Sequence, residues 1–88
     1  MEILLDGNKI LNKEMLFDTI KEQVKSADFY GSNLDALWDV LSQDIDNLVV
    51  TLKNTSELEN NLGDYLTRLL NLFNDLNETA MNVRIDKS

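Results

Sequence analysis

The chain has 88 residues, enough for one domain with a modest core, and 43% of them are hydrophobic, too many for a disordered chain. The formal net charge of −8 disfavours nucleic acid and anionic membrane surfaces as partners and favours a basic protein. The absence of cysteine and histidine excludes disulfides, thiol nucleophiles, a histidine proton shuttle and the common transition-metal sites. We therefore expect a binding protein without cofactors, not an enzyme. The lack of cysteine, of a signal-peptide pattern and of a long apolar run favours a cytoplasmic location.

Short apolar runs and turn signals predict the first elements. Residues 1–5 contain Ile-Leu-Leu, which predicts a buried strand, and the Asp-Gly-Asn at 6–8 predicts a turn. That turn either closes a hairpin onto 9–11 or leads into the next helix. An amphipathic helix is predicted over 13–25, with Asn12 as its N-cap. Its predicted buried face consists of Leu16, Phe17, Ile20 and Val24.

A loop is predicted to lead into a short helix over 33–42. Ser32 is a good N-cap, and its spacing from Asp35 has the form of a capping box. A second stripe of this helix carries Asp35, Asp39 and Ser42, at i, i+4 and i+7. The apolar stripe consists of Leu34, Leu37, Trp38 and Leu41, of which the leucines are expected in the core.

The acidic stripe lacks a basic neighbour in the sequence, because no Lys or Arg occurs between Lys25 and Lys53. A carboxylate at Asp35 favours the helix dipole and the cap, so Asp35 fits either a purely structural role or a contact with a partner. Asp39 lies one turn further into the helix and has no such explanation. Trp38 fits either a core position or a contact with a partner. The combination of an unpaired acid and an aromatic residue suggests a face that awaits a cationic partner.

The second half of the chain is predicted to contain two strands and two helices. The β-branched-rich run at 48–52 predicts a strand covered on more than one side, and Ser56-Glu57-Leu58-Glu59 predicts a short helix that starts with a capping box. A further helix is predicted over 63–78 and an edge strand with one wet face over 81–86. Strands separated by helices imply parallel pairing, so we expect an α/β fold in a single domain over residues 1–88. The apolar stripe of the last helix is Leu62, Leu66, Leu69, Phe73 and Leu76.

The stretch Tyr30-Gly31-x-Asn33-Leu34-Asp35-Ala36-Leu37-Trp38-Asp39 closely resembles the signature of the barstar family, the intracellular inhibitors of barnase-type ribonucleases. Total length and element order agree over essentially the whole chain. Lys53-Asn54 and Leu72-Phe73-Asn74-Asp75 also align, the latter after a one-residue deletion between 44 and 72. The resemblance implies a barstar-like fold, with a three-stranded parallel sheet and three to four helices packed against it.

The resemblance also implies a mechanism, in which helix 33–42 and its adjoining loops plug the active site of a basic ribonuclease. Asp39 would mimic an RNA phosphate in the catalytic pocket, and Asp35 would pair with a basic residue beside it. Asp75 would be an outlying charge contact, and Trp38 would pack at the rim. The implied partner-binding residues are Phe29, Tyr30, Gly31, Asn33, Leu34, Asp35, Trp38, Asp39, Ser42, Asp44 and Asp75.

Several positions depart from the family pattern. Phe29 stands where the prototype has Tyr, Gln43 and Asp44 replace a Gly-Trp pair, and Thr79 aligns with an acidic position. These changes lie at the rim of the implied surface and leave the identity of the ribonuclease open. The implied partner is a basic, extracellular-type ribonuclease of the barnase kind, and we expect the free chain to be a monomer that binds neither nucleic acid nor membrane.

Two alternatives stay open at this point. A small acidic chain without cysteine also fits an acyl carrier protein, whose prosthetic group would be attached to Ser32. Carrier proteins are all-helical, so the strand-like runs at 48–52 and 81–85 argue against this reading. The other alternative is an acidic protein-binding module with a different partner.

Overall fold

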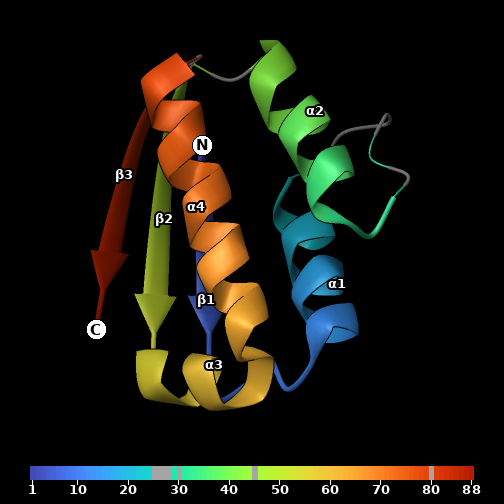
Figure 1. Ribbon diagram of the computed structural model, residues 1–88, viewed down its shortest axis with the longest axis vertical. Helices are drawn as coiled ribbons and strands as arrows, with labels where there is room; N and C mark the ends of the chain where they lie inside the picture. The colour runs from blue at the N-terminus through green and yellow to red at the C-terminus, as the bar shows by residue number, and fades with distance from the viewer. Residues whose placement is uncertain (25–28, 30, 45, 80) are drawn as a thin grey trace.

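The chain folds as an α/β protein. The computed structural model describes residues 1–24, 29, 31–44, 46–79 and 81–88, with the side chain of Asp44 outside the description. In these ranges the three strands pair in the order β1-β2-β3 and are all parallel (Figure 1), which confirms the predicted fold class. The elements are β1 (Glu2–Asp6), α1 (Lys13–Gln23), α2 (Leu34–Asp44), β2 (Asn47–Lys53), α3 (Thr55–Leu62), α4 (Asp64–Thr79) and β3 (Asn82–Lys87).

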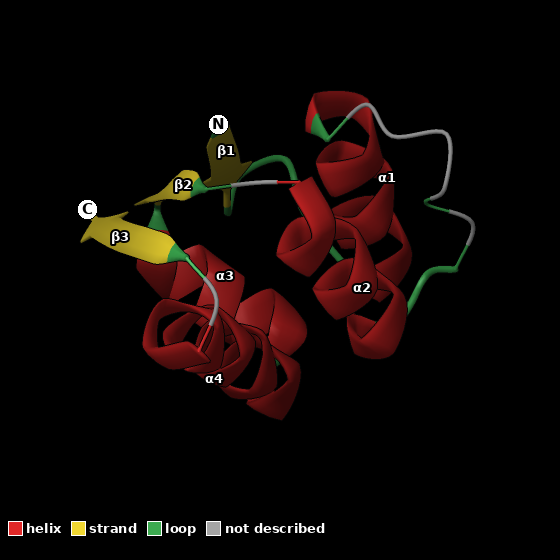
Figure 2. Cartoon of the chain, turned by 90° about the horizontal axis from the view of Figure 1, so that it is seen from above, coloured by secondary structure: helices red, strands yellow, loops and turns green. Residues whose placement is uncertain are grey.

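The helices that the structure describes all lie on one side of the sheet (Figure 2). The side chains of β1 and β2 that face them are fully buried, whereas Val49 and Thr51 on the opposite face are only half-buried. The expectation that the central strand is covered on more than one side is therefore wrong, because only one face carries helices. The buried residues on the covered face are Ile3, Leu5, Leu48, Val50 and Leu52.

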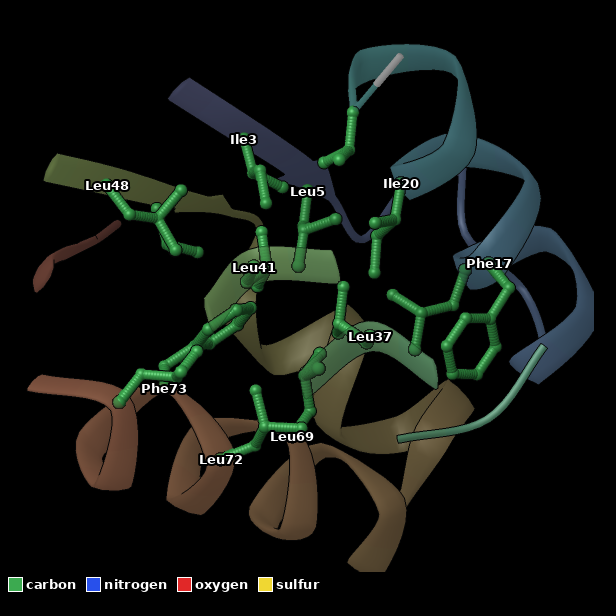
Figure 3. Close-up of a cluster of buried hydrophobic side chains, with 14 of the residues drawn as sticks. Ile3, Leu5, Phe17, Ile20, Leu37, Leu41, Leu48, Leu69, Leu72 and Phe73 are labelled. Atoms are coloured by element: carbon green, nitrogen blue, oxygen red, sulfur yellow. The ribbon is translucent and has the colours of Figure 1, made fainter. Parts of the chain in front are cut away.

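The core fills the space between the sheet and the helices. Side chains from β1, β2, α1, α2 and α4 point toward a common centre (Figure 3), with Phe17 and Phe73 among the largest that are buried. Burial of such side chains supplies the main favourable free energy of folding. The residues predicted for the core faces of the two amphipathic helices are all buried, but Leu62 ends α3 and does not belong to α4. The buried residues are Leu16, Phe17, Ile20, Val24, Leu62, Leu66, Leu69, Phe73 and Leu76.

The turn after β1 leads into a helix and does not close a hairpin. The backbone amides of Lys9 and Ile10 donate to the carbonyl of Asp6 at 2.9 and 3.0 Å, and Ile10 is fully buried. The chain then enters α1, where the amide of Met15 donates to the side-chain oxygen of Asn12 at 2.8 Å. This bond confirms Asn12 as the N-cap of α1.

The short helix after β2 exists, but its predicted start is wrong. α3 begins at Thr55, and its N-cap is Asn54, which has a left-handed backbone with φ 52° and no side-chain capping bond. The side-chain amide of Asn54 instead donates to the carboxylate of Asp6 at 2.8 Å. Because asparagine tolerates this backbone region, the helix starts directly after the strand, and Ser56 lies inside it.

The last two elements match their predicted positions closely. α4 covers nearly the predicted range 63–78, and β3 is an edge strand of the sheet. Val83 and Ile85 of β3 pair with the buried Leu48 and Val50 of β2 and pack against the core. Within the described ranges, no helix is long and apolar enough to span a lipid bilayer.

Candidate functional site

The start of α2 is set by Asn33. Its side-chain oxygen accepts a hydrogen bond from the amide of Ala36 at 2.8 Å, the geometry of an N-cap. The prediction that Ser32 caps this helix is therefore wrong by one residue. The Ser32 hydroxyl instead accepts a hydrogen bond from the Lys21 ammonium at 2.9 Å. Asp35 is consequently the second residue of the helix, still within its first turn, and no capping box forms because the third is Ala36.

The two faces of α2 have opposite characters. Leu37, Val40 and Leu41 are buried, which holds one side of the helix in the core. Asp35 and Asp39 are both exposed on the other side. Among the residues that the structure describes, none makes a hydrogen bond or an ion pair to either carboxylate. The helix thus presents two negative charges that the described part of the chain does not neutralise.

A shallow hollow of about 310 Å³ lies between α2 and α4. Leu34 and Trp38 are half-buried and pack against the core, so they form an apolar base with Leu72. The leucine at 34 was expected in the core and is instead only partly covered. Charged side chains stand at the rim, and the structure brings Asp75 of α4 into the same hollow as Asp35. The lining residues are Leu34, Asp35, Trp38, Arg68, Asn71, Leu72 and Asp75.

Arg68 and Asn71 were not identified from the sequence. Arg68, Leu72 and Asp75 are spaced at i, i+4 and i+7, which places them on one face of α4. That spacing, applied from Asp75 backwards, is a signal that points to Arg68. Arg68 lines the same hollow as Asp35 and Asp75, so this chain has a cation of its own close to these two carboxylates. In the described ranges, Arg68 forms no ion pair with either of them.

Two predicted contacts before α2 have clear structural surroundings. The side chain of Phe29 is only 8% exposed and belongs to the core. A Cβ atom on Gly31 would lie 2.8 Å from the Cβ of Ala36, so glycine is required there for close packing against α2. Tyr30 lies outside the described residues.

The remaining predicted residues lie at the ends of α2 and α4. The hydroxyl of Ser42 donates to the backbone carbonyl of Asp39 at 3.3 Å, and Ser42 is half-buried. Asp44 ends α2, and its side chain lies outside the description. Asp75 is exposed, and its carbonyl accepts a hydrogen bond from the Thr79 hydroxyl at 2.8 Å. The structure therefore gathers Leu34, Asp35, Trp38 and Asp75 around one hollow, with Asp39 exposed on the same helix.

A second hollow of about 260 Å³ borders the residues that precede α2 and is lined by Lys13, Glu14, Phe17, Ser32 and Tyr65. The Tyr65 ring packs edge-on against Phe17 with a centroid distance of 6.1 Å, and the Lys13 ammonium lies 4.9 Å from its centroid. Burial raises the pKa of the Tyr65 hydroxyl above its ordinary value of 10.0, and the positive charge of Arg68 partly offsets that effect. Tyr65 is thus a neutral, partly apolar side chain that shares this hollow with Ser32.

Comparison of the sequence with known proteins found similar proteins. A sequence model of the family described as Barstar (barnase inhibitor) matches residues 1–86. A Bacillus subtilis (strain 168) protein named "Putative ribonuclease inhibitor YrdF" is 37% identical over 78 residues, which make up 88% of this chain and 86% of that protein. The family match spans the sheet, α2 and the hollow between α2 and α4.

Proposed function

Because this chain belongs to the barstar family, we propose that it inhibits a basic ribonuclease of the barnase type by laying the exposed acidic face of α2 over the active site of that enzyme. The observation that carries the proposal is that Asp39 is exposed and unpaired among the described residues. Asp39 stands beside the half-buried Trp38, and no described residue neutralises it. A charge left unpaired on a well-packed helix costs little in water and gains a partner on binding.

The binding mechanism follows from the charge that a ribonuclease must recognise. An enzyme that cleaves RNA holds phosphate groups with cationic side chains, and a carboxylate can replace a phosphate in such a pocket. Asp39 is the carboxylate that enters the pocket in our proposal. Access by RNA is then blocked both sterically, by the helix, and electrostatically, because the cations are already paired. No Lys or Arg occurs between Lys25 and Lys53 to weaken this charge.

The other residues of the surface take supporting roles. Asp35 and Asp75 at the rim of the hollow attract a cationic side chain beside the pocket, and its methylene groups pack on Trp38. Gly31, Asn33 and Leu34 supply contacts at the start of α2. The remaining proposed contacts are Tyr30 before the helix and Ser42 and Asp44 at its end.

Phe29 contributes differently from the contact implied by the resemblance. With only 8% of its side chain exposed, it offers little surface to another molecule. We assign it the role of anchoring the residues before α2 to the core.

Membership of a family of inhibitors confirms the prediction that the chain is not an enzyme. The parallel sheet excludes the acyl carrier protein, since that family is all-helical. An acidic module with another partner is the remaining alternative. The free chain is proposed to be a monomer that forms a one-to-one complex.

Inhibition of RNA cleavage tests the proposal directly. Purified protein is titrated into barnase, and activity is expected to fall linearly to zero at one equivalent. In parallel, the immobilised chain is used to capture proteins of its own host, and a basic ribonuclease is expected among them. Full barnase activity in excess inhibitor, together with capture of a partner that does not cleave RNA, overturns the proposal and supports the alternative module.

A further inference from the structure

Lys21 connects α1 to the residues that precede the acidic helix. Its ammonium donates a hydrogen bond to the Ser32 hydroxyl at 2.9 Å and lies 5.3 Å from the centroid of the Phe29 ring. Both are recognised stabilising geometries, a charge-assisted hydrogen bond and a cation–π contact. α1 and α2 are neighbours on the helical side of the sheet (Figure 2), and the contacts of Lys21 reach from α1 to residues that precede α2. One side chain thus contacts two residues that flank Gly31.

Two of the described residues before α2, Gly31 and Asn33, also contact α2 directly. We call Phe29, Gly31, Ser32 and Asn33 the binding segment. Gly31 packs so closely on Ala36 that an added Cβ would clash, and Asn33 caps the helix. Phe29 is buried in the core. Ser32 is exposed, and its hydroxyl is held by the hydrogen bond from Lys21.

The charge of Lys21 is directed at neutral groups. A lysine placed at random near α2 would pair with a carboxylate and weaken the acidic face. Here the hydrogen-bond acceptor is a hydroxyl, and the other contact is an aromatic ring. Within the described ranges no ion pair joins Lys21 to Asp35 or Asp39. The contact therefore orders the segment without cancelling the negative charge that the inhibitor needs.

We propose that Lys21 is a positioning residue, which holds the binding segment in its binding-competent arrangement before the ribonuclease arrives. The inference rests on the proposed function, because the surface it orders is the inhibitory one. An ordered segment loses less conformational entropy on binding. The measured Kd equals the intrinsic Kd divided by the competent fraction, so a fall of that fraction to about one tenth raises Kd about tenfold.

The direction in which the affinity changes when Lys21 loses its ammonium distinguishes a positioning role from a purely electrostatic effect. The partner is basic, so removing a cation from the inhibitor on electrostatic grounds alone speeds association and tightens binding. Loss of a positioning contact weakens binding instead. The two explanations predict opposite changes for the same substitution.

The test compares three variants in binding to barnase by stopped flow and calorimetry. Lys21→Met keeps the apolar stem but removes the ammonium, and we expect Kd to rise about tenfold. Lys21→Arg keeps a donor and a cation over the ring, and it is expected to stay within about threefold of the unchanged protein. Lys87→Met on β3 removes the same charge far from α2 and controls for net charge; it is expected to leave Kd unchanged or slightly lower.

A second set of measurements isolates the hydrogen bond and the order it creates. Ser32→Ala is expected to weaken binding, and the double variant with Lys21→Met to be no worse than Lys21→Met alone, because both remove the same contact. In the free protein, backbone ¹⁵N order parameters of Gly31, Ser32 and Asn33 are expected to fall in Lys21→Met. Denaturant unfolding of each variant reports any general loss of stability.

The outcomes separate this inference from the proposed function. If the unchanged protein inhibits barnase but Lys21→Met binds as tightly or more tightly, the positioning role is overturned and inhibition stands. If the unchanged protein does not bind barnase, the order parameters of the free chain decide: a fall in Lys21→Met supports the positioning of the segment, and unchanged values overturn it.

Discussion

The side-chain oxygen of Asn33 accepts the amide hydrogen of Ala36 at 2.8 Å, and this bond determines where the acidic helix begins. It places Asp35 in the first turn, where the positive end of the helix dipole stabilises a carboxylate. Asp39 stands one turn further on, with no described residue to neutralise it. The cap therefore gives the negative charge of Asp35 a structural role at the helix start, which the position of Asp39 does not have.

The first prediction concerns this cap. Asn33→Ala is expected to lower the free energy of unfolding by about 1 kcal/mol, since it removes the acceptor for a helix-end amide. Urea unfolding of the free protein followed by circular dichroism measures the change. Ser32→Ala is the neighbouring control and is expected to cost clearly less, because its hydroxyl does not cap the helix. A larger loss for Ser32→Ala would show that serine caps the helix in solution.

The second prediction concerns Asp39. Asp39→Ala is expected to weaken the complex with barnase by about 2–5 kcal/mol, the range for truncating one partner of a buried charge pair, to which the barnase–barstar complex itself contributed measurements. Calorimetry measures the change. The stability of the free protein is expected to stay the same or rise slightly, because Asp35 loses a like charge one turn away.

Asp18→Ala is the matched control for Asp39→Ala. Asp18 is exposed on α1, so this substitution removes the same charge from a surface outside the proposed interface. It is expected to change the affinity little. A loss of less than about tenfold for Asp39→Ala, or roughly 1.4 kcal/mol, contradicts the role assigned to Asp39.

The third prediction concerns the hollow between α2 and α4, whose rim carries charges of both signs. Asp75→Asn is expected to weaken binding of a basic ribonuclease, and Arg68→Gln to tighten it, each by about 0.2–1 kcal/mol, because both side chains are exposed. Association rates at low and at physiological salt measure the effect, which is expected to shrink as salt screens the charges. Changes of the same sign in both variants would rule out a cationic group in the hollow.

The fourth prediction concerns Asp6 at the end of β1. Hydrogen bonds from the Asn54 side chain at 2.8 Å, and then from the Asn8 amide at 2.9 Å, hold the pKa of Asp6 below its ordinary value of 3.8. A lowered pKa in the folded state adds stability that is fully present above pH 3.8 and is lost as the pH falls through the folded value. Asp6→Asn is therefore expected to be less stable than the unchanged protein at pH 7.

The pH dependence supplies the check on Asp6. The stability difference between Asp6→Asn and the unchanged protein is expected to be constant above about pH 5 and to narrow below pH 3.8. Urea unfolding at a series of pH values measures it. If the stability difference is as large at the lowest pH as at neutral pH, the charge of the Asp6 carboxylate does not contribute to it.

The elements of this fold were predictable because each must bury one face. The repeats at Leu16, Ile20 and Val24, in α1 and at its C-cap, and at Leu66, Leu69 and Phe73 in α4 matched the helical period. All of these residues are buried. The exposed face of the sheet was less predictable. Val49 and Thr51 are β-branched like the buried Val50 between them, although no described helix lies on their side of the sheet.

By itself the sequence determined the order and type of the elements, the absence of cysteine and histidine chemistry, and the acidic signature that pointed to the barstar family. All three are local properties, set by periodic burial and by the residues present. Only the tertiary structure shows that Asn33 caps α2 while the Ser32 hydroxyl accepts a hydrogen bond from Lys21 of another helix. Packing of α4 on α2 likewise brought Arg68 and Asp75 beside Asp35. Contacts between elements depend on how the whole core closes, and neighbouring positions in the chain do not encode that.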